Sequence, residues 1–287
     1  MTAADASPPT ALFEPVGADG WMATELARGP WDPRHCHGGP VSALLARAVE
    51  HVETGAEAGP SATDWQVARL SVELTRPVPI GVPLTLVTHV ERPGRKVSLV
   101  AVVLSDGETE VARARALRIR TVDVDLPADT VQPTADPPGS PGDGRTIASS
   151  WGTESGIAFH THACDHRFVE GSWDEPGPVA AWIRITKPVV DGEEPSGVQR
   201  AVAAADFGNG VSRGLDAERF LFINPDLTVH LIRQPVGEWI GMRTASYYGV
   251  DDRSTGAGMA ESALYDAHGR LGRSVQSLFV EPRQDNG

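Results

Sequence analysis

Apolar residues recur at every second position in several stretches of the chain, which predicts β-strands with one buried face. In the first part of the chain these stretches cover residues 12–16, 21–26, 68–74, 84–90, 97–103 and 110–119. Between them, residues 41–52 repeat their apolar positions at spacings of three and four, which is typical of an amphipathic helix. The sequence Ser105-Asp106-Gly107 predicts a turn between the last two strands.

The second part of the chain repeats this order of strands, one helix and a run of long strands. Its expected strands are residues 158–169, 179–189, 227–232, 239–248, 258–265 and 272–280. A helix is expected to begin at Ser196, a good N-cap residue, because Val198, Ala201, Val202 and Ala205 follow at helical spacing.

Several short matches in the same order relate the two parts and indicate an internal duplication. Aligned positions are Leu70, Val72 and Leu74 with Leu227, Val229 and Leu231, and then Pro77-Val78 with Pro235-Val236. Between the two parts lies a stretch rich in Pro, Asp, Gly and Thr without apolar periodicity, which predicts a linker over residues 122–155. We therefore expect two domains, at residues 10–121 and 156–283.

The composition suits a globular protein with a sizeable core, since 40% of the 287 residues are hydrophobic. A formal charge of -13 argues against nucleic acid as a partner. Residues 66–120 nevertheless carry nine basic and five acidic residues, which either lie on solvated strand faces or help to steer phosphates. No stretch is apolar enough to cross a membrane and the N-terminus does not resemble a signal peptide, so we expect a cytoplasmic protein.

The two cysteines do not form a disulfide framework. Cys36 is flanked by two histidines, and is either a nucleophile or a thiol that only shares a loop with them. His160, His162, Cys164 and His166 alternate along an expected strand, where they would span about 20 Å. Because one tetrahedral ion cannot bind ligands so far apart, we expect no metal site.

A series of short motifs in both parts carries a resemblance to a known family. These motifs are His37-Gly38-Gly39, Arg76-Pro77, Ala205-Asp206, Asn224-Pro225-Asp226, Glu238-Trp239 and Ser274-Val275-Gln276. In this order and spacing they resemble the acyl-CoA thioesterases of the thioesterase II (TesB-like) type. The resemblance implies an α+β double hotdog, in which two fused domains each wrap an antiparallel sheet around a long helix.

In that family an Asp, a hydroxyl residue and a Gln hold one catalytic water. The resemblance places Asp206 and Gln276 on the family's Asp and Gln. The hydroxyl position falls on Asn224, which departs from the pattern, and Thr228 is the substitute if the alignment shifts. Asp206 would act as general base while the amides orient the water. Taken singly, each of these residues could instead be an ordinary loop, turn or strand residue.

The substrate is expected to meet backbone N–H groups at two glycine-containing segments. His37, Gly38 and Gly39 precede the first helix, where such a motif offers N–H groups to a thioester carbonyl. Gly208 and Gly210 follow Asp206 and allow a close approach of the ligand to the backbone.

The first half lacks the matching chemistry. Where the resemblance implies an acid, about two turns into the helix, the sequence reads Leu45-Ala46-Arg47, and Ala116 aligns with Gln276. One site per chain is therefore expected, and Glu50 should be unimportant for turnover.

The resemblance implies hydrolysis of an acyl-CoA thioester without a cofactor. A non-catalytic acyl-CoA or lipid-binding protein of the same fold is the alternative, supported by Asn224. A hotdog hydratase is less favoured, because no suitable His follows Asp206 and Asn209. The expected partners are acyl-CoA and a second copy of the chain, joined through sheet or helix faces, with neither nucleic acid nor membrane.

Overall fold

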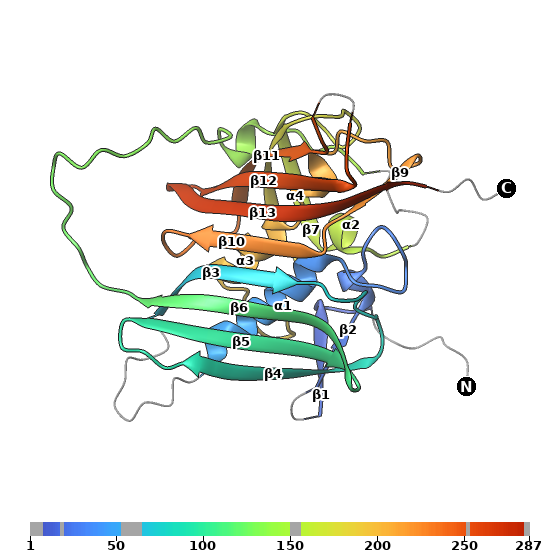
Figure 1. The fold of residues 1–287 in the computed structure, drawn as a ribbon, viewed down its shortest axis with the longest axis horizontal. Helices are drawn as coiled ribbons and strands as arrows, with labels where there is room; N and C mark the ends of the chain where they lie inside the picture. Colours follow the sequence, from blue (N-terminus) through green and yellow to red (C-terminus); the bar gives the residue numbers. More distant parts are fainter. Residues whose placement is uncertain (1–7, 18–19, 53–64, 150–155, 251–252, 284–287) are drawn as a thin grey trace.

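The described strands join into one antiparallel sheet of 13 strands (Figure 1). This computed structural model describes residues 8–17, 20–52, 65–149, 156–250 and 253–283. Along the sheet the order is β1-β2-β4-β5-β6-β3-β10-β13-β12-β11-β8-β7, and β9 pairs with β13.

The first half of the chain forms the helix and strands that its apolar pattern predicts, except that the strand expected over residues 21–26 ends at Ala23 and a 3-10 helix follows it. The elements are β1 (Phe13–Val16), β2 (Gly20–Ala23), the 3-10 helix η1 (Glu25–Ala27), α1 (Gly38–His51), β3 (Trp65–Glu73), β4 (Pro83–Arg92), β5 (Val97–Asp106) and β6 (Thr109–Arg120). Helix α1 begins three residues before the expected helix, because the side chain of His37 caps it by accepting the N–H of Gly39.

The second half follows with a similar order. Its elements are η3 (Pro141–Asp143), α2 (Phe159–His162), β7 (Cys164–Glu170), β8 (Val179–Ile185), α3 (Gly197–Ala205), α4 (Gly208–Val211), β9 (Phe220–Ile223), β10 (Asp226–Leu231), β11 (Ile240–Tyr247), β12 (Ala257–Asp266) and β13 (Gly269–Pro282). The predicted N-cap of α3 is confirmed, since Ser196 Oγ accepts the N–H of Gln199 at 3.1 Å.

The prediction of one strand over residues 158–169 is wrong. Its first residues form the turn α2, in which the N–H groups of His162 and Ala163 donate to the carbonyls of Ala158 and Phe159. Ala158 and Phe159 are adjacent and both fully buried, a pattern that a helical turn allows and a half-buried strand does not. The strand β7 begins only at Cys164.

The two halves meet at the middle of the sheet, where β3 and β10 pair antiparallel. Leu70 lies opposite Val229, and Val72 lies opposite Leu227. Between these pairs Ser71 faces Thr228, its equivalent in the sequence repeat, and the hydroxyl of Thr228 donates to Ser71 Oγ at 3.2 Å. An approximate twofold axis therefore passes between Ser71 and Thr228.

Helices α1 and α3 lie together on one face of the sheet, behind β3 and β10 in Figure 1. They run in opposite directions, so that the start of each helix meets the end of the other. At one end the N-cap Ser196 of α3 donates to Glu50 in the last turn of α1 (2.8 Å). At the other end the N-cap His37 of α1 contacts Asp206, the C-cap of α3. Two sheet halves wrapped around this helix pair make the expected α+β double hotdog.

The chain leaves the sheet after β6 in a connection that swings away from the body (Figure 1). Residues 121–137 are exposed throughout. The connection returns to the second half at Asp136, whose carbonyl accepts from Arg243 Nε at 3.0 Å, and at Pro138, whose carbonyl accepts from Trp182 Nε1 at 3.3 Å. Of the expected linker, residues 150–155 lie outside the described residues.

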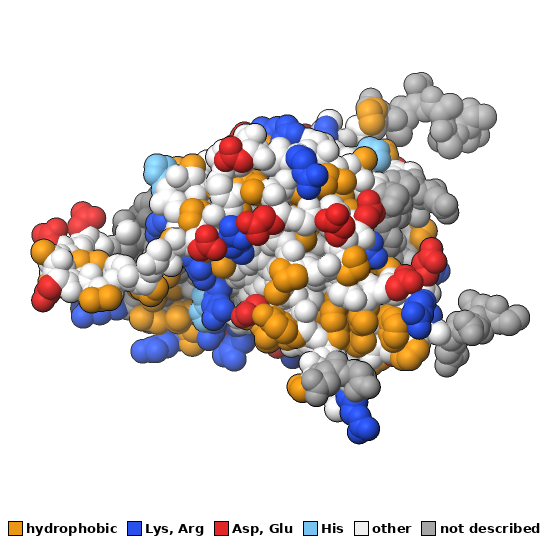
Figure 2. Space-filling view, turned by 90° about the horizontal axis from the view of Figure 1, so that it is seen from above, with side chains coloured by type: hydrophobic (Ala, Val, Ile, Leu, Met, Phe, Trp, Pro, Cys, Tyr) orange, Lys and Arg blue, Asp and Glu red, His pale blue; other side chains and the backbone are white. Residues whose placement is uncertain are grey.

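Acidic and basic side chains are interspersed on the face drawn in Figure 2. In the described part of the chain, no helix is both long and apolar enough to cross a bilayer.

Candidate active site

The carboxylate of Asp206 is the centre of a buried polar cluster at the C-terminus of α3. Its side chain is only 3% exposed. Its Oδ1 accepts hydrogen bonds from Asn224 Nδ2 at 2.8 Å and from Gln276 Nε2 at 3.2 Å. Its Oδ2 lies 2.9 Å from His37 Nδ1. The structure thus brings together four residues that lie far apart in the sequence.

The backbone of α4 sets the orientation of the Gln276 amide. The N–H of Asn209 donates to Gln276 Oε1 at 3.0 Å, which leaves Nε2 to face Asp206. A glycine is required beside this amide, since a Cβ at Gly208 would lie 2.9 Å from Gln276 Oε1. Gly208 therefore permits the contact on which the position of Gln276 depends, while Gly210 lies further along α4.

His37 has two mutually exclusive hydrogen-bonding states. Its Nδ1 lies 3.0 Å from the amide nitrogen of Gly39 and 2.9 Å from Asp206 Oδ2. Nδ1 can accept the N–H of Gly39 only when it carries no proton, and can donate to Asp206 only when it carries one. In the second state the N–H of Gly39 is released from the cap. The ring is held by packing on Phe159 and Phe207, with centroids 5.2 and 4.9 Å away.

Gly38 is the point of closest approach between the start of α1 and the acid. A Cβ at this position would lie 2.7 and 2.9 Å from the two carboxylate oxygens of Asp206, and 3.0 Å from Leu74 Cδ1. Gly39 is equally confined, since its Cβ would lie 2.9 Å from the carbonyl oxygen of Ala203. The two glycines therefore allow the N-terminus of α1 to touch the C-terminus of α3.

The structure separates the two alternatives for the third polar residue. Asn224 lies between β9 and β10 and its amide donates directly to Asp206. Thr228 is not brought to Asp206; it lies at the twofold axis and bonds to Ser71. Of the two residues considered for the family's hydroxyl position, Asn224 is therefore the one that contacts Asp206.

The surroundings of the cluster are aromatic and hold a second buried imidazole. The ring of His166 packs on Phe207 and Trp173, with both centroids 4.9 Å away. Burial, with smaller contributions from His160 and His37, lowers the pKa of His166 to about 3. His166 is therefore neutral at physiological pH and adds no charge beside Asp206.

The other candidate groups of the sequence do not form a reactive site. Burial raises the pKa of the Cys36 thiol well above its usual range, which disfavours the nucleophilic thiolate. His160 and His162 lie in α2 whereas Cys164 and His166 lie in β7, so the expected arrangement along one strand is wrong. Among the described residues, no three His, Cys, Asp or Glu side chains converge as a metal site.

The twofold axis relates this cluster to a second place that lacks its chemistry. Asp206 comes ten residues after the N-cap Ser196, and Arg47 comes ten residues after the N-cap His37. Arg47 there bonds to Glu193, with Nε 2.5 Å from Oε2. Ala116 takes the place of Gln276, because Ser71 pairs with Arg115 where Thr228 pairs with Val275. The two positions equivalent to Asp206 and Gln276 therefore carry neither an acid nor an amide. The acid at this end of the helix pair is Glu50, which accepts hydrogen bonds from Ser196 and Gln199.

Sequence reasoning missed the direct contact of His37 with Asp206, and the roles of Phe159, Phe207 and the Asn209 N–H. The only signal for Asn209 was its position three residues after Asp206.

Solved structures with very different sequences share the fold over nearly the whole chain. A conserved protein of unknown function with a hot dog fold from Alicyclobacillus acidocaldarius is 14% identical, with a TM-score of 0.65 over 94% of this chain and 95% of that one. The tesB protein of Mycobacterium avium subs paratuberculosis is 16% identical, with a TM-score of 0.63 over 95% and 97%. The acyl-CoA thioesterase II TesB2 of Mycobacterium marinum is 16% identical, with a TM-score of 0.59 over 96% and 97%.

Family models match both halves of the sequence. The acyl-CoA thioesterase N-terminal domain matches residues 27–119, and the acyl-CoA thioesterase C-terminal domain matches residues 128–280. No curated protein sequence matches the chain. These two matches together span most of the sequence. They show that the chain belongs to the acyl-CoA thioesterase family and is a thioester hydrolase with a double-hotdog fold.

Proposed function

We propose that the protein hydrolyses an acyl-CoA to the free acid and CoA, using a water molecule activated by Asp206. The observation that carries this proposal is the geometry of the Asp206 carboxylate. It is buried, bonded on one oxygen to Asn224 and Gln276, and placed against the N-terminus of α1. A thioester carbonyl beside the N–H groups of that terminus would lie next to the base.

The reaction follows from these positions. Asp206 removes a proton from the water as its oxygen attacks the thioester carbon, and the carbonyl oxygen becomes negatively charged. In the tautomer that carries its proton on Nδ1, His37 donates to Asp206 and leaves the N–H of Gly39 free to stabilise this oxyanion. When the C–S bond breaks, the proton held by Asp206 passes to the departing sulfur, which restores the carboxylate.

Asn224 serves this mechanism without a hydroxyl group. Its Nδ2 holds Asp206, and its Oδ1 supplies an acceptor for the water. Gln276 contributes by position, because its Nε2 donates to Oδ1 of the same carboxylate. Three residues of the second half and the helix start of the first half therefore form one site per chain.

Release of the free CoA thiol, measured over a series of acyl chain lengths, tests this function. We expect saturable turnover for at least one acyl-CoA and its loss in the Asp206→Asn variant. A protein that binds acyl-CoA tightly and releases no thiol would instead be the non-catalytic acyl-CoA-binding or lipid-binding protein.

A further inference from the structure

A pocket of about 580 Å³ opens beside the N-terminus of α3, at the end of that helix opposite to Asp206. The twofold axis relates this end of α3 to the end of α1 where the catalytic cluster lies. The charged residues of the lining are Arg184, Lys187, Arg200, Glu193, Glu194 and Glu238. Nothing in the proposed hydrolysis uses this pocket.

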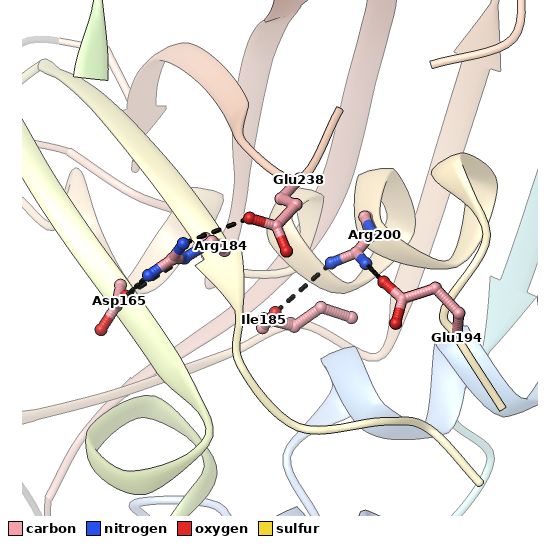
Figure 3. Close-up of polar contacts among 6 residues, drawn as sticks. All are labelled: Asp165, Arg184, Ile185, Glu194, Arg200 and Glu238. Atoms are coloured by element: carbon pink, nitrogen blue, oxygen red, sulfur yellow. Dashed lines mark hydrogen bonds and ion pairs between the residues drawn. The ribbon is translucent and has the colours of Figure 1, made fainter. Parts of the chain in front are cut away.

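Arg200 is the buried part of the lining and is fixed by the backbone. The residue is 6% exposed, and its guanidinium donates to the carbonyl of Pro195 through Nε at 3.2 Å and to that of Ile185 at 3.4 Å. Its remaining edge forms an ion pair with Glu194, whose side chain is 81% exposed (Figure 3). The guanidinium is therefore held in place whether or not Glu194 stays bound.

A second arginine of the pocket repeats this arrangement. One edge of Arg184 bonds to Asp165, with Nη2 2.5 Å from Oδ2, and the ring of Trp239 lies 4.9 Å from the guanidinium. The other edge bonds to Glu238, whose side chain is 57% exposed, at 3.2 Å (Figure 3). Each arginine thus turns one edge toward an exposed carboxylate of the same chain.

We propose that this pocket binds a phosphate-bearing molecule, whose phosphate replaces the carboxylate of Glu194 on the guanidinium of Arg200. Glu194 is 81% exposed, so its carboxylate can leave for solvent, and a phosphate that takes its place keeps the buried guanidinium of Arg200 paired. A phosphate offers more charge and more acceptor oxygens than a carboxylate, and matches the planar fork of arginine. Lys187 and Arg184 add two further cations, and the volume admits a phosphate ester or diphosphate rather than a single ion.

Titration calorimetry of the full chain with inorganic pyrophosphate tests the proposal. The Glu194→Gln variant should bind roughly three to ten times more tightly, because one competing ion pair and one repulsive charge are removed. Lys187→Gln should weaken binding by a similar factor, and added salt should weaken it in every variant. Glu108→Gln, an exposed change in the turn between β5 and β6, is the matched control and should change nothing.

The Arg200→Gln variant should lose binding, provided that its thermal unfolding shows an intact fold. Should it unfold, Glu194→Gln and Lys187→Gln decide the question, since neither residue is buried. The proposal is overturned if wild type and Glu194→Gln both fail to bind pyrophosphate at millimolar concentration, or if Glu194→Gln does not increase the affinity. None of these measurements depends on turnover, so they stand apart from the outcome for Asp206.

Titrations with CoA and ADP then distinguish the two sources of such a phosphate. Two CoA molecules per chain, one of them sensitive to Glu194→Gln, would identify CoA as the ligand. One CoA per chain, together with ADP binding that Glu194→Gln strengthens, would identify a free nucleotide.

Discussion

Replacing Asp206 by asparagine separates the role of its charge from the role of its shape. The asparagine oxygen can still accept from Asn224 and Gln276, as Oδ1 does in the native protein. The new amide nitrogen would face His37 Nδ1, which can accept from it when unprotonated. The hydrogen-bonded cluster should therefore survive, whereas the variant loses the proton acceptor and, with it, the donation from His37 that frees the N–H of Gly39.

The size of the effect follows from that loss. General-base catalysis contributes about 10²–10⁴ in rate, which corresponds to about 3–5 kcal/mol of barrier at 1.36 kcal/mol per factor of ten. The affinity for acyl-CoA should change little, because the missing interaction belongs to the transition state. Gln276→Ala should reduce turnover less than Asp206→Asn, since Gln276 positions the carboxylate and takes no proton.

The assay is thiol release under single-turnover conditions, with the affinity for acyl-CoA measured separately. Asp129→Asn, the same substitution at an exposed site in the connection between the halves, is the control and should keep full activity. If Asp206→Asn keeps more than half of the wild-type rate, Asp206 is not the base, even though the family assignment would stand.

Four further perturbations test other parts of the structure. Gly38→Ala places a methyl group against both oxygens of Asp206, so turnover should fall at least about 100-fold and the free energy of unfolding by roughly 1–3 kcal/mol. The control is Gly142→Ala, whose new methyl group would meet no atom closer than 3.6 Å, and which should keep its activity and melting temperature. Proteolysis within residues 122–137 should leave two halves that elute together in gel filtration, because β3–β10 pairing and helix packing join them; halves that separate without denaturant would contradict the shared sheet. Acyl-CoA should raise the melting temperature more than CoA does, since the acyl chain buries additional apolar area, and equal shifts would argue against an acyl site. The folded-state pKa of His166, about 3, lies below its ordinary value near 6.5, so its contribution to stability is complete above that pH and is lost at about 1.4 kcal/mol per unit as the pH falls toward 3; denaturant midpoints measured across this range should lose that slope in His166→Phe.

Much of the fold was predictable because its elements have strong local periodicity. Strand β10 buries every second residue, β3 does so on either side of one irregularity after Val67, and α3 starts at a serine that caps it. Periodicity failed at α2, where the chain makes a helical turn directly before β7. This turn is too short to show a helical repeat in the sequence, so its residues were assigned to the strand that follows.

The candidate site was predictable only in its residue types. Asp206 and Gln276 could be placed by their motifs, but the contact of His37 with Asp206 depends on how α1 and α3 pack. The contacts of Glu50 show the same limit, because it accepts hydrogen bonds from Ser196 and Gln199 across the helix pair and burial raises its pKa. That Glu50 is unimportant for turnover stays a prediction. Such pairings depend on the relative placement of two helices, which the local sequence does not encode.

The pairing of Ser71 with Thr228 has a consequence for how this protein can evolve. In a homodimer of identical single-hotdog chains, the two residues at the axis would be one residue meeting its own copy, and each mutation would appear at both places at once. A change equivalent to Arg47 would then remove Asp206 as well and abolish both sites. Joining the halves in one polypeptide lifts that restriction. The second half can keep Asp206 while the equivalent position of the first half becomes Arg47, and the two ends of the helix pair can come to bind different ligands.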